Sequence, residues 1–252
     1  MSTISKQSIR SRVVSIGDLS EADRQRMYTI LCEHFTGVDK EVFDSDLREK
    51  SWVICVEDDS GQIQGFSTLQ RMTVPFGDGQ AHAFFSGDTV LSSQVMGDAS
   101  WIPVWTRHVF REAAKLAPEK SYWLLLTATH KTYRILPSCF EEFIPRPNQS
   151  VSPILVELMG KFVRKKFPQE FRPESGLVVL SKAIPYRHAN QVEREAESGE
   201  HRSATRYFKK VNPKFLRGDF LCCLTEIDPN NLTLLGQRIL NPAPTRHTMA
   251  AA

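Results

Sequence analysis

The stretch Gln94–Ala99, with the sequence Gln-Val-Met-Gly-Asp-Ala, has a spacing that suits anion binding. It lies between an apolar, strand-like run at 83–91 and a helical run at 101–116. A small-residue turn between a strand and a helix directs several backbone N–H groups at one point, and the positive end of the helix dipole adds to them. The chain has neither a Walker GxxxxGK[ST] pattern nor a GxGxxG turn. A phosphate or pyrophosphate of a different kind of ligand is therefore expected here.

Three ionisable residues near this turn have side chains that can move protons. Asp88 lies in an otherwise apolar strand, where burial would raise the pKa of its carboxyl toward the range of a general base. His130 follows the next apolar run, and imidazole titrates near neutrality. Tyr133 has a phenol, whose ordinary pKa of about 10 suits a proton donor. Each also has a structural interpretation: a polar group at a bulge for Asp88, a helix cap or exposed group for His130, and packing for Tyr133.

Other residues of reactive type have weaker patterns. His34 and His82 have no partners at ligand spacing and are expected to be structural. Trp101, Trp105 and Trp123 are interpreted as core residues or as the wall of a substrate pocket, and the sequence leaves both open.

The composition excludes several functional classes. The chain has 252 residues, of which 41% are hydrophobic, enough for a substantial core, and a net charge of only +3, which argues against nucleic-acid binding. Its five cysteines include no CxxC pair and no zinc spacing, so we expect no metal site. Free thiols, with Cys222 and Cys223 buried and inert, fit a reducing cytosol. No secretory signal is found, and no apolar run approaches the about 20 residues that span a bilayer, so a cytoplasmic location is predicted.

These residues need a scaffold, and the periodicity of the chain predicts one. The expected strands are 11–16, 52–57, 64–74, 82–91, 122–128, 176–181 and 220–227. The expected helices are 21–35, 39–50, 100–116, 130–136, 153–167 and 204–210, with a last helix from 228 to about 240, and 190–201 as an exposed helix or loop. Ser20 and Asp23 resemble a capping box, Asp58–Gly61 predicts a hairpin turn, and 75–80 another turn. Gly87 indicates a bulge, and Pro137 is expected to end its helix.

The order strand, two helices, three antiparallel strands, helix, strand and helix covers 11 to about 143 and resembles the GNAT N-acyltransferase superfamily. That family has a Q/R-x-x-G-x-G/A signature before its third helix, and Gln94, Gly97 and Ala99 fit it. A second register, anchored on Leu91, places Met96 at the glutamine or basic position instead. The resemblance implies a mixed α/β (α+β) fold, with a central, mostly antiparallel sheet flanked by helices and a smaller C-terminal α/β extension.

The resemblance also implies a site. The fourth and fifth strands should splay apart, and the pantetheine arm of coenzyme A should lie in the gap. Tyr133 matches the family's tyrosine and would protonate the departing thiolate, although Pro-Ser-Cys-Phe at 137–140 replaces the usual Gly-Phe. Asp88 or His130 would serve as base. The implied contacts with acetyl-CoA or a longer acyl-CoA are Thr89, Val90, Leu91, Gln94, Val95, Met96, Gly97, Asp98, Ala99 and Ser100.

We therefore predict an N-acyltransferase that moves an acyl group to a small-molecule or peptide amine by direct attack in a ternary complex. Residues 11–146 would form the GNAT-like domain, 147–242 an extension on the acceptor side that shapes a pocket for a larger acceptor or longer acyl chain, and 243–252 a disordered tail. An acyl carrier protein is an alternative donor. It would suit a basic set with interleaved aromatics, which otherwise forms a solvated face: Arg202, Arg206, Lys209, Lys210, Lys214 and Arg217, with Tyr207, Phe208 and Phe215.

Two other functions stay open at this point. A catalytically degenerate protein of the same fold could bind a ligand or partner without turnover. The absence of the arginine that the family signature often has, and of the family's Gly-Phe, favours that alternative. Tyr133 and the turn at Gly97 and Ala99 disfavour it. Nucleic-acid binding through residues 202–217 is the other open function. The small net charge argues against it, because nucleic-acid-binding proteins are typically strongly basic.

Overall fold

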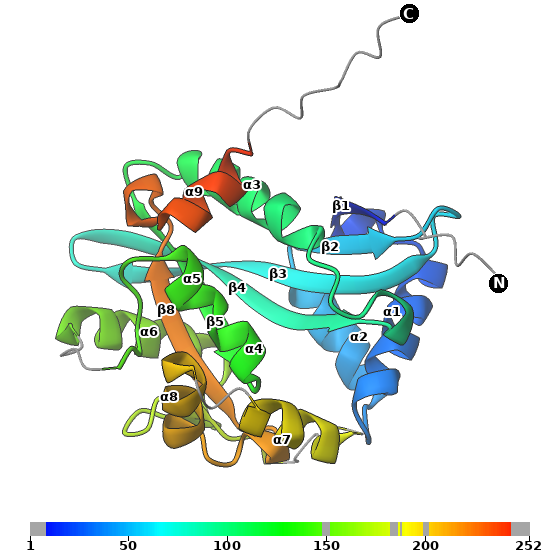
Figure 1. Ribbon diagram of the computed structural model, residues 1–252. Helices are drawn as coiled ribbons and strands as arrows, with labels where there is room; N and C mark the ends of the chain where they lie inside the picture. The colour runs from blue at the N-terminus through cyan, green and yellow to red at the C-terminus, as the bar shows by residue number, and fades with distance from the viewer. Residues whose placement is uncertain (1–8, 148–151, 182–185, 187, 199–201, 243–252) are drawn as a thin grey trace, which may run out of the picture.

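A single mixed sheet runs through the protein in the computed structural model (Figure 1), which describes residues 9–147, 152–181, 186, 188–198 and 202–242. The strand order is β1-β2-β3-β4-β5-β8-β7-β6. The strands are β1 (Arg10–Ser15), β2 (Trp52–Glu57), β3 (Ile63–Phe76), β4 (Gly79–Leu91), β5 (Lys120–Thr127), β6 (Phe171–Arg172), β7 (Leu177–Val178) and β8 (Phe220–Glu226).

Nine α-helices and four short 3₁₀ helices accompany the strands within the described residues. The α-helices are α1 (Glu21–His34), α2 (Lys40–Glu49), α3 (Trp101–Ala114), α4 (His130–Tyr133), α5 (Ile135–Cys139), α6 (Pro153–Lys166), α7 (Ala189–Ser198), α8 (Ser203–Val211) and α9 (Leu234–Leu240). The 3₁₀ helices are η1 (Ile16–Asp18), η2 (Ser93–Val95), η3 (Phe215–Arg217) and η4 (Pro229–Asn231). The capping box predicted at Ser20 and Asp23 is present, and each side chain accepts from the other's backbone N–H.

All but one of the strand pairs are antiparallel. β1 to β4 form an antiparallel series, β4 and β5 are parallel, and β8 returns antiparallel to β5. The predicted fold class, a mostly antiparallel sheet flanked by helices, is confirmed.

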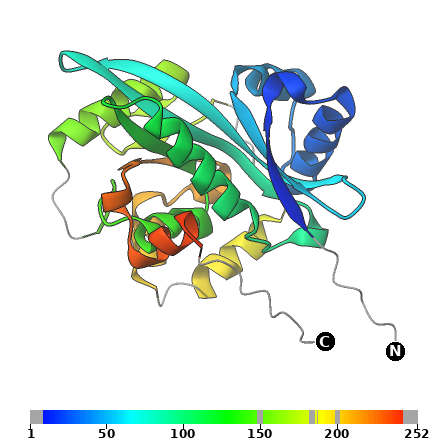
Figure 2. The ribbon, with the colours of Figure 1, turned by 90° about the horizontal axis from the view of Figure 1, so that it is seen from above.

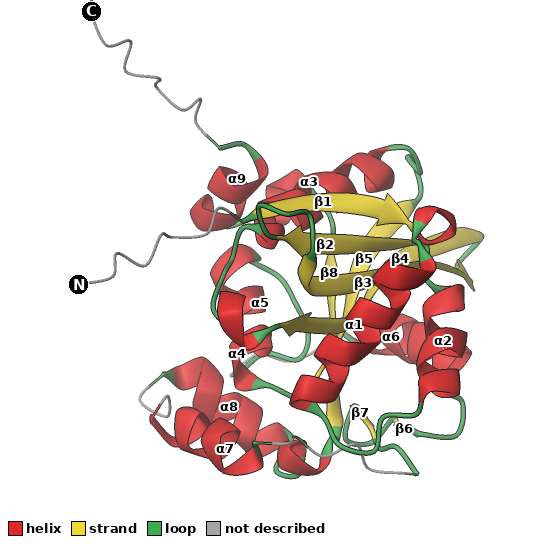
Figure 3. Cartoon of the chain, turned by 90° about the vertical axis from the view of Figure 1, so that its right-hand side faces the viewer, coloured by secondary structure: helices red, strands yellow, loops and turns green. Residues whose placement is uncertain are grey.

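Helices cover both faces of this sheet (Figures 2 and 3). On one face, α3 and the short helices α5 and α9 pack over a core that includes Leu69, Phe84 and Trp123. On the other face, α6 covers one apolar cluster, and α1 with α2 covers a second. Because successive strand residues point to opposite faces, each strand contributes side chains to both layers.

The segment after residue 146 continues the same sheet. β8 pairs with β5 from Tyr122↔Glu226 to Thr127↔Leu221, and its side chains enter the cores of both faces. How the chain divides into domains stays a prediction, and the tail predicted at 243–252 lies outside the described residues. Among those residues, no helix is both long and apolar enough to cross a membrane.

Several predicted boundaries were wrong. Pro137 does not end a helix but lies in the first turn of α5, where its missing N–H breaks no hydrogen bond. The hairpin between β3 and β4 extends through Phe76↔Gly79, so the turn predicted at 75–80 narrows to two residues. The last predicted helix is interrupted, because η4 ends at Asn231 and Thr233 caps a separate α9.

Candidate active site

Strands β4 and β5 diverge in the middle of the sheet, as the resemblance implied. Their parallel pairing ends at Ser86↔Leu125, whereas β4 continues to Leu91. A bulge in β4 begins at the same point, because the register with β3 shifts between Ser67 and Leu69. A Cβ on Gly87 would lie 2.5 Å from the Thr68 hydroxyl oxygen, so the bulge depends on glycine. The backbone groups of β4 that face the gap are therefore not paired with β5.

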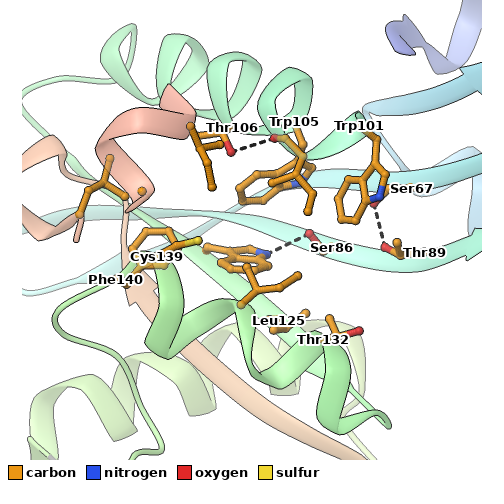
Figure 4. Close-up of a pocket in the computed structure, with 16 residues that line it drawn as sticks. Ser67, Ser86, Thr89, Trp101, Trp105, Thr106, Leu125, Thr132, Cys139 and Phe140 are labelled. Carbon is orange, nitrogen blue, oxygen red and sulfur yellow. Dashed lines mark hydrogen bonds between the residues drawn. The ribbon is translucent and has the colours of Figure 1, made fainter. Parts of the chain in front are cut away.

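A pocket with roughly 530 Å³ of empty space, counting the part open to solvent, lies at this divergence on the α3 face (Figure 4). One end is lined by Ser67, Thr89 and Thr132 at the gap between the strands. The other end is lined by residues that precede or belong to α9, among them Leu232 and Ile239. The remaining wall consists of Ser86, Trp101, Ile102, Trp105, Thr106, Trp123, Leu125, Ile135, Cys139, Phe140 and Gly236.

The hydroxyl groups of the pocket already have partners. Ser67 and Thr89 share a hydrogen bond of 2.9 Å, and Thr106 donates to the Ile102 carbonyl. Thr132 is bonded to Thr129 within the cap of α4. The pocket therefore offers a ligand a mostly apolar surface.

The three tryptophans left open by the sequence all line this pocket. Trp123 donates its indole N–H to the Ser86 hydroxyl at 2.9 Å, and its ring lies 4.8 Å from that of Trp105, centroid to centroid. The indole nitrogen of Trp105 is buried and has no partner among the described residues. A buried N–H without a partner costs free energy, which a bound acceptor would recover.

A charged cluster occupies the opposite face of the sheet, where the C-terminal ends of α2 and α6 meet. Lys50, whose side chain is 1% exposed, pairs with Asp46 at 2.8 Å and lies 4.9 Å from the centre of the Phe85 ring. Lys166 pairs with the other oxygen of Asp46 at 2.8 Å and with Glu49. The ammonium groups of Lys50 and Lys166 are therefore held by carboxylates. This charged cluster lies between the apolar cluster under α6 and the apolar cluster under α1 and α2.

Asp88 belongs to this cluster and stands in the bulge of β4. Burial, and then the nearby Asp46 carboxylate, raise the pKa of the Asp88 carboxyl to about 6, against the opposing charges of Lys50 and Lys166. The Asp88 side chain forms no hydrogen bond or ion pair with any other described residue. A half-buried carboxylate with a raised pKa and no partner has the properties of a general base.

The other two predicted catalytic residues do not line the pocket. Tyr133 is fully buried, its hydroxyl donates to the Pro145 carbonyl at 2.9 Å, and its burial raises its pKa above the ordinary value. His130 is the first residue of α4. Burial, and then the positive charges of Lys131 and Arg134, lower the pKa of its imidazole to about 4. Thr132, between them in the sequence, does reach the pocket. The roles proposed for Tyr133 and His130 stay predictions.

The Gln94–Ala99 turn begins within η2 and leads into α3, as its position in the sequence requires. Gly97 has φ +86°, a left-handed conformation that favours glycine. The backbone N–H groups of Gly97, Ala99 and Trp101 make no hydrogen bond within the described part of the chain. The N–H of Ser100 is different, because it donates to the Asp98 carboxylate at 2.8 Å. An anion at this turn would therefore meet free N–H groups beside one carboxylate.

The remaining predicted residues have structural surroundings. His34 donates to the Leu91 carbonyl at 2.7 Å, and His82 is bonded to Thr73 and Glu119. Cys222 and Cys223 are buried free thiols. The aromatics of the basic set are not interleaved with it on the surface, since Phe208 and Phe215 are core residues and Tyr207 packs against Tyr133. No group of residues within the described ranges is arranged to hold a metal ion.

Sequence reasoning missed the charged cluster around Asp88. Lys50 and Lys166 are separated by 115 intervening positions, and nothing in either local pattern indicates that they share Asp46. The residues of α9 in the pocket were missed for the same reason. Only the packing of α9 against α3 and α5 brings them there.

Comparison with known proteins gives matches among solved structures alone. No protein-family model matches the chain, and neither does any curated protein. A probable N-acyltransferase from Enterococcus faecalis is 15% identical over 54% of this chain and a third (33%) of its own length, with a TM-score of 0.40. A GNAT family N-acetyltransferase from Escherichia coli, solved with CoA, is 12% identical over 52% of this chain and 69% of its own, with a TM-score of 0.37.

A third solved structure is glucosamine-6-phosphate N-acetyltransferase from Arabidopsis thaliana. It is 14% identical over 57% of this chain and 95% of its own length, with a TM-score of 0.38.

Proposed function

We propose that this protein transfers an acyl group from a thioester to an amine. The observation that carries the proposal is the position of the β4 bulge between two chemically different spaces. On the α3 face lies an apolar pocket, and on the opposite face lies a half-buried carboxylate in a charged cluster. An acyl thioester is mostly apolar and an amine acceptor is polar and basic, so the two faces suit the two substrates.

The donor would occupy the gap between β4 and β5. The backbone of β4 beyond Ser86 has no strand partner on that side, so it can pair with the amides of a pantetheine arm. The arm would leave toward the Gln94–Ala99 turn, where the free N–H groups near Gly97 suit a pyrophosphate. The donor is then an acyl-CoA, of acetyl or longer chain length. An acyl carrier thioester shares the pantetheine arm, and the exposed Arg206, Lys210 and Lys214 of the α8 region would attract an acidic carrier protein.

The acceptor would approach from the face of Asp88. The Asp88 carboxylate accepts a proton from the attacking amine, and the new bond joins the amine nitrogen to the acyl carbon. Unpaired N–H groups of β4 stabilise the negative charge on the carbonyl oxygen. The bond from the acyl carbon to sulfur then breaks, the thiolate takes up a proton from water or from the acid predicted at Tyr133, and Asp88 releases the amine's proton to water, so that the products are an amide and a free thiol. Lys50 and Lys166 are held by Asp46 and Glu49, so they keep the cluster close to neutral.

A second function, ligand or partner binding without turnover, is favoured by two observations. The Tyr133 hydroxyl is engaged with Pro145, and the exposed Met96 stands where the alternative register of the family signature places a basic residue or glutamine. The five cysteines form no disulfide and four of them are buried, which supports a reducing compartment such as the cytosol for either function.

The test combines binding with turnover. Purified protein is titrated with acetyl-CoA and with S-acetyl and S-octanoyl pantetheine, and the melting temperature is followed. Release of free thiol is then measured with a panel of primary amines. We expect at least one thioester to stabilise the fold and thiol release to depend on the amine. Stabilisation without thiol release would favour the binding function, and no stabilisation by any thioester would exclude the donor site.

The same assay examines the role predicted for Tyr133. If its phenol protonates the thiolate, Tyr133→Phe lowers the rate of thiol release without changing thioester affinity. An unchanged rate, with a lower melting temperature from the lost bond to Pro145, would assign Tyr133 to packing alone.

A further inference from the structure

We propose that the acyl group carried by the donor is an aliphatic chain longer than acetyl, and that it lies in the end of the pocket that α9 closes. This inference rests on the proposed function. It names the class of donor, which the function itself leaves between acetyl and longer chains.

The pocket is elongated and mostly apolar. From the gap between β4 and β5 it continues under α3 as far as α9 (Figure 4). An acetyl group at the gap would reach only the end lined by Ser67, Thr89 and Thr132. The far end is lined by Cys139, Phe140 and Ile239, whose side chains are apolar apart from the Cys139 thiol. Such a space would be left empty by acetyl and filled by methylene groups.

The indole N–H of Trp105 has no hydrogen-bond partner among the described residues. Trp105 is 5% exposed and lines the pocket, and its ring neighbour Trp123 is bonded to Ser86, the last residue of β4 that pairs with β5. A thioester whose carbonyl lies where the strands separate would supply the missing acceptor. With the carbonyl at that level, the pantetheine arm extends toward Trp101 and the acyl chain extends toward α9.

Helix α9 is held firmly and so sets a fixed limit to the length of the acyl chain. A Cβ on Gly236 would lie 2.4 Å from the Cys139 carbonyl oxygen, so the backbone of α9 touches that of α5 directly. Thr233 adds two bonds, its N–H to the Cys139 carbonyl at 3.0 Å and its hydroxyl to the Ser138 carbonyl at 2.7 Å. The wall is therefore well placed to select by length, because it cannot retreat without breaking these contacts.

The chain offers a matched pair of substitutions on α9. Ile239 lines the pocket, whereas Leu235 on the same helix is 49% exposed and does not. Ile239→Trp should fill the far end of the pocket, and Leu235→Trp places the same side chain in solvent. Ile239→Ala enlarges the pocket and provides a second, less disruptive variant.

The experiment measures the dissociation constants of S-acetyl, S-butanoyl, S-octanoyl and S-dodecanoyl pantetheine and of the corresponding CoA thioesters. A fully buried methylene is worth about fourfold in affinity. We expect the wild-type protein to prefer octanoyl over acetyl by about tenfold or more. Ile239→Trp should reduce that preference below about threefold while keeping acetyl affinity, Leu235→Trp should keep the preference, and Ile239→Ala should move it to longer chains.

Equal affinity for all chain lengths in the wild-type protein would overturn this inference and leave the proposed function intact. An unchanged preference in both Ile239 variants would also overturn it. Failure of every thioester to bind would remove both together. Comparing each acyl pantetheine with its acyl-CoA distinguishes the two possible carriers of the acyl group. Tighter binding of the CoA thioester would show that the protein binds the nucleotide, whereas equal affinities would indicate a carrier-protein donor.

Discussion

At the scale of single residues, Asp88 combines three properties that structural carboxylates seldom share. It stands in a bulge of a central strand, it has a raised pKa, and it has no partner among the described residues. A neutral or apolar side chain at this position would make the folded protein more stable than an unpaired carboxylate does. The arrangement therefore reduces stability at the position where the proposed function needs a proton acceptor.

The first prediction is that Asp88→Asn stabilises the protein above pH 6. The pKa of Asp88 rises from an ordinary 3.8 to about 6 on folding, so the folded state holds the proton more tightly. Stability is then lost as pH rises from about 4 to about 6, because the unfolded state releases the proton first. At pH 7 the variant should be more stable by about 1–2 kcal/mol, after a discount for partial exposure. Denaturant melts at pH 4 and pH 7 measure this difference.

The second prediction concerns the activity of the same variant. Thiol release by the wild-type protein should rise with pH through about 6, where Asp88 ionises. In Asp88→Asn that rise should disappear, and turnover should fall by about 10²–10⁴-fold. Asp78→Asn, in the exposed hairpin turn before β4, is the matched control and should keep the wild-type profile. A variant of Asp88 with full activity would show that another group takes the proton.

At the scale of elements, the turn before α3 ties backbone geometry to ligand preference. Its free N–H groups depend on the left-handed conformation of Gly97. The Asp98 carboxylate already accepts from Ser100, so the turn would bind a pyrophosphate through its backbone alone.

The third prediction uses two glycines with the same kind of backbone. Gly97 has φ +86° and Gly77 has φ +58°, and neither has a neighbour that a Cβ would meet. Alanine at either position should cost about 1–2 kcal/mol of stability, because a left-handed conformation is strained for it. Gly97→Ala alone should weaken acyl-CoA binding, by roughly threefold to tenfold, while leaving acyl pantetheine binding unchanged. Equal effects of both variants on acyl-CoA binding would show that the turn does not contact the nucleotide.

How far the sequence predicts these elements depends on whether their signals are local. The strand and helix positions up to residue 128 follow from hydrophobic period, capping residues and turn types, and they match the structure closely. The bulge at Gly87 was also predictable, since a glycine followed by an aspartate interrupts an apolar strand. Asp88 could be named as a candidate base for the same reason, because the apolar residues around it in the sequence predict that it is buried.

The features that the sequence did not predict depend on contacts between distant segments. The Tyr133 hydroxyl is oriented by its hydrogen bond to the Pro145 carbonyl and by aromatic rings of α8. The sequence around residue 133 gives no indication of either contact. The cluster around Asp88 joins the ends of α2 and α6, and the pocket needs α9 to close it. Each is an encounter of three or more elements, for which a single sequence has no local signal.

At the scale of the whole molecule, the arrangement of the sheet couples the C-terminal segment to the site. β8 lies against β5, which forms one side of the gap, and side chains of β8 enter the cores on both faces. The segment after 146 thus supports β5 from its other edge and also supplies α9 to the pocket. The two regions predicted from sequence should therefore lose their structure together.

The last prediction tests this coupling with a substitution in β8. Leu224 is fully buried opposite Leu124 of β5, and Leu224→Ala should cost about 2–5 kcal/mol through the cavity it leaves. All four tryptophans lie between 52 and 123, so their fluorescence reports on the unfolding of the first region, including its contacts with β8 and α9. If the regions unfold together, the fluorescence midpoint in denaturant shifts by the full amount with an unchanged slope. Leu234→Ala, at a side chain 74% exposed, should leave it in place. A midpoint that Leu224→Ala does not move would mean that residues 11–146 fold independently of β8.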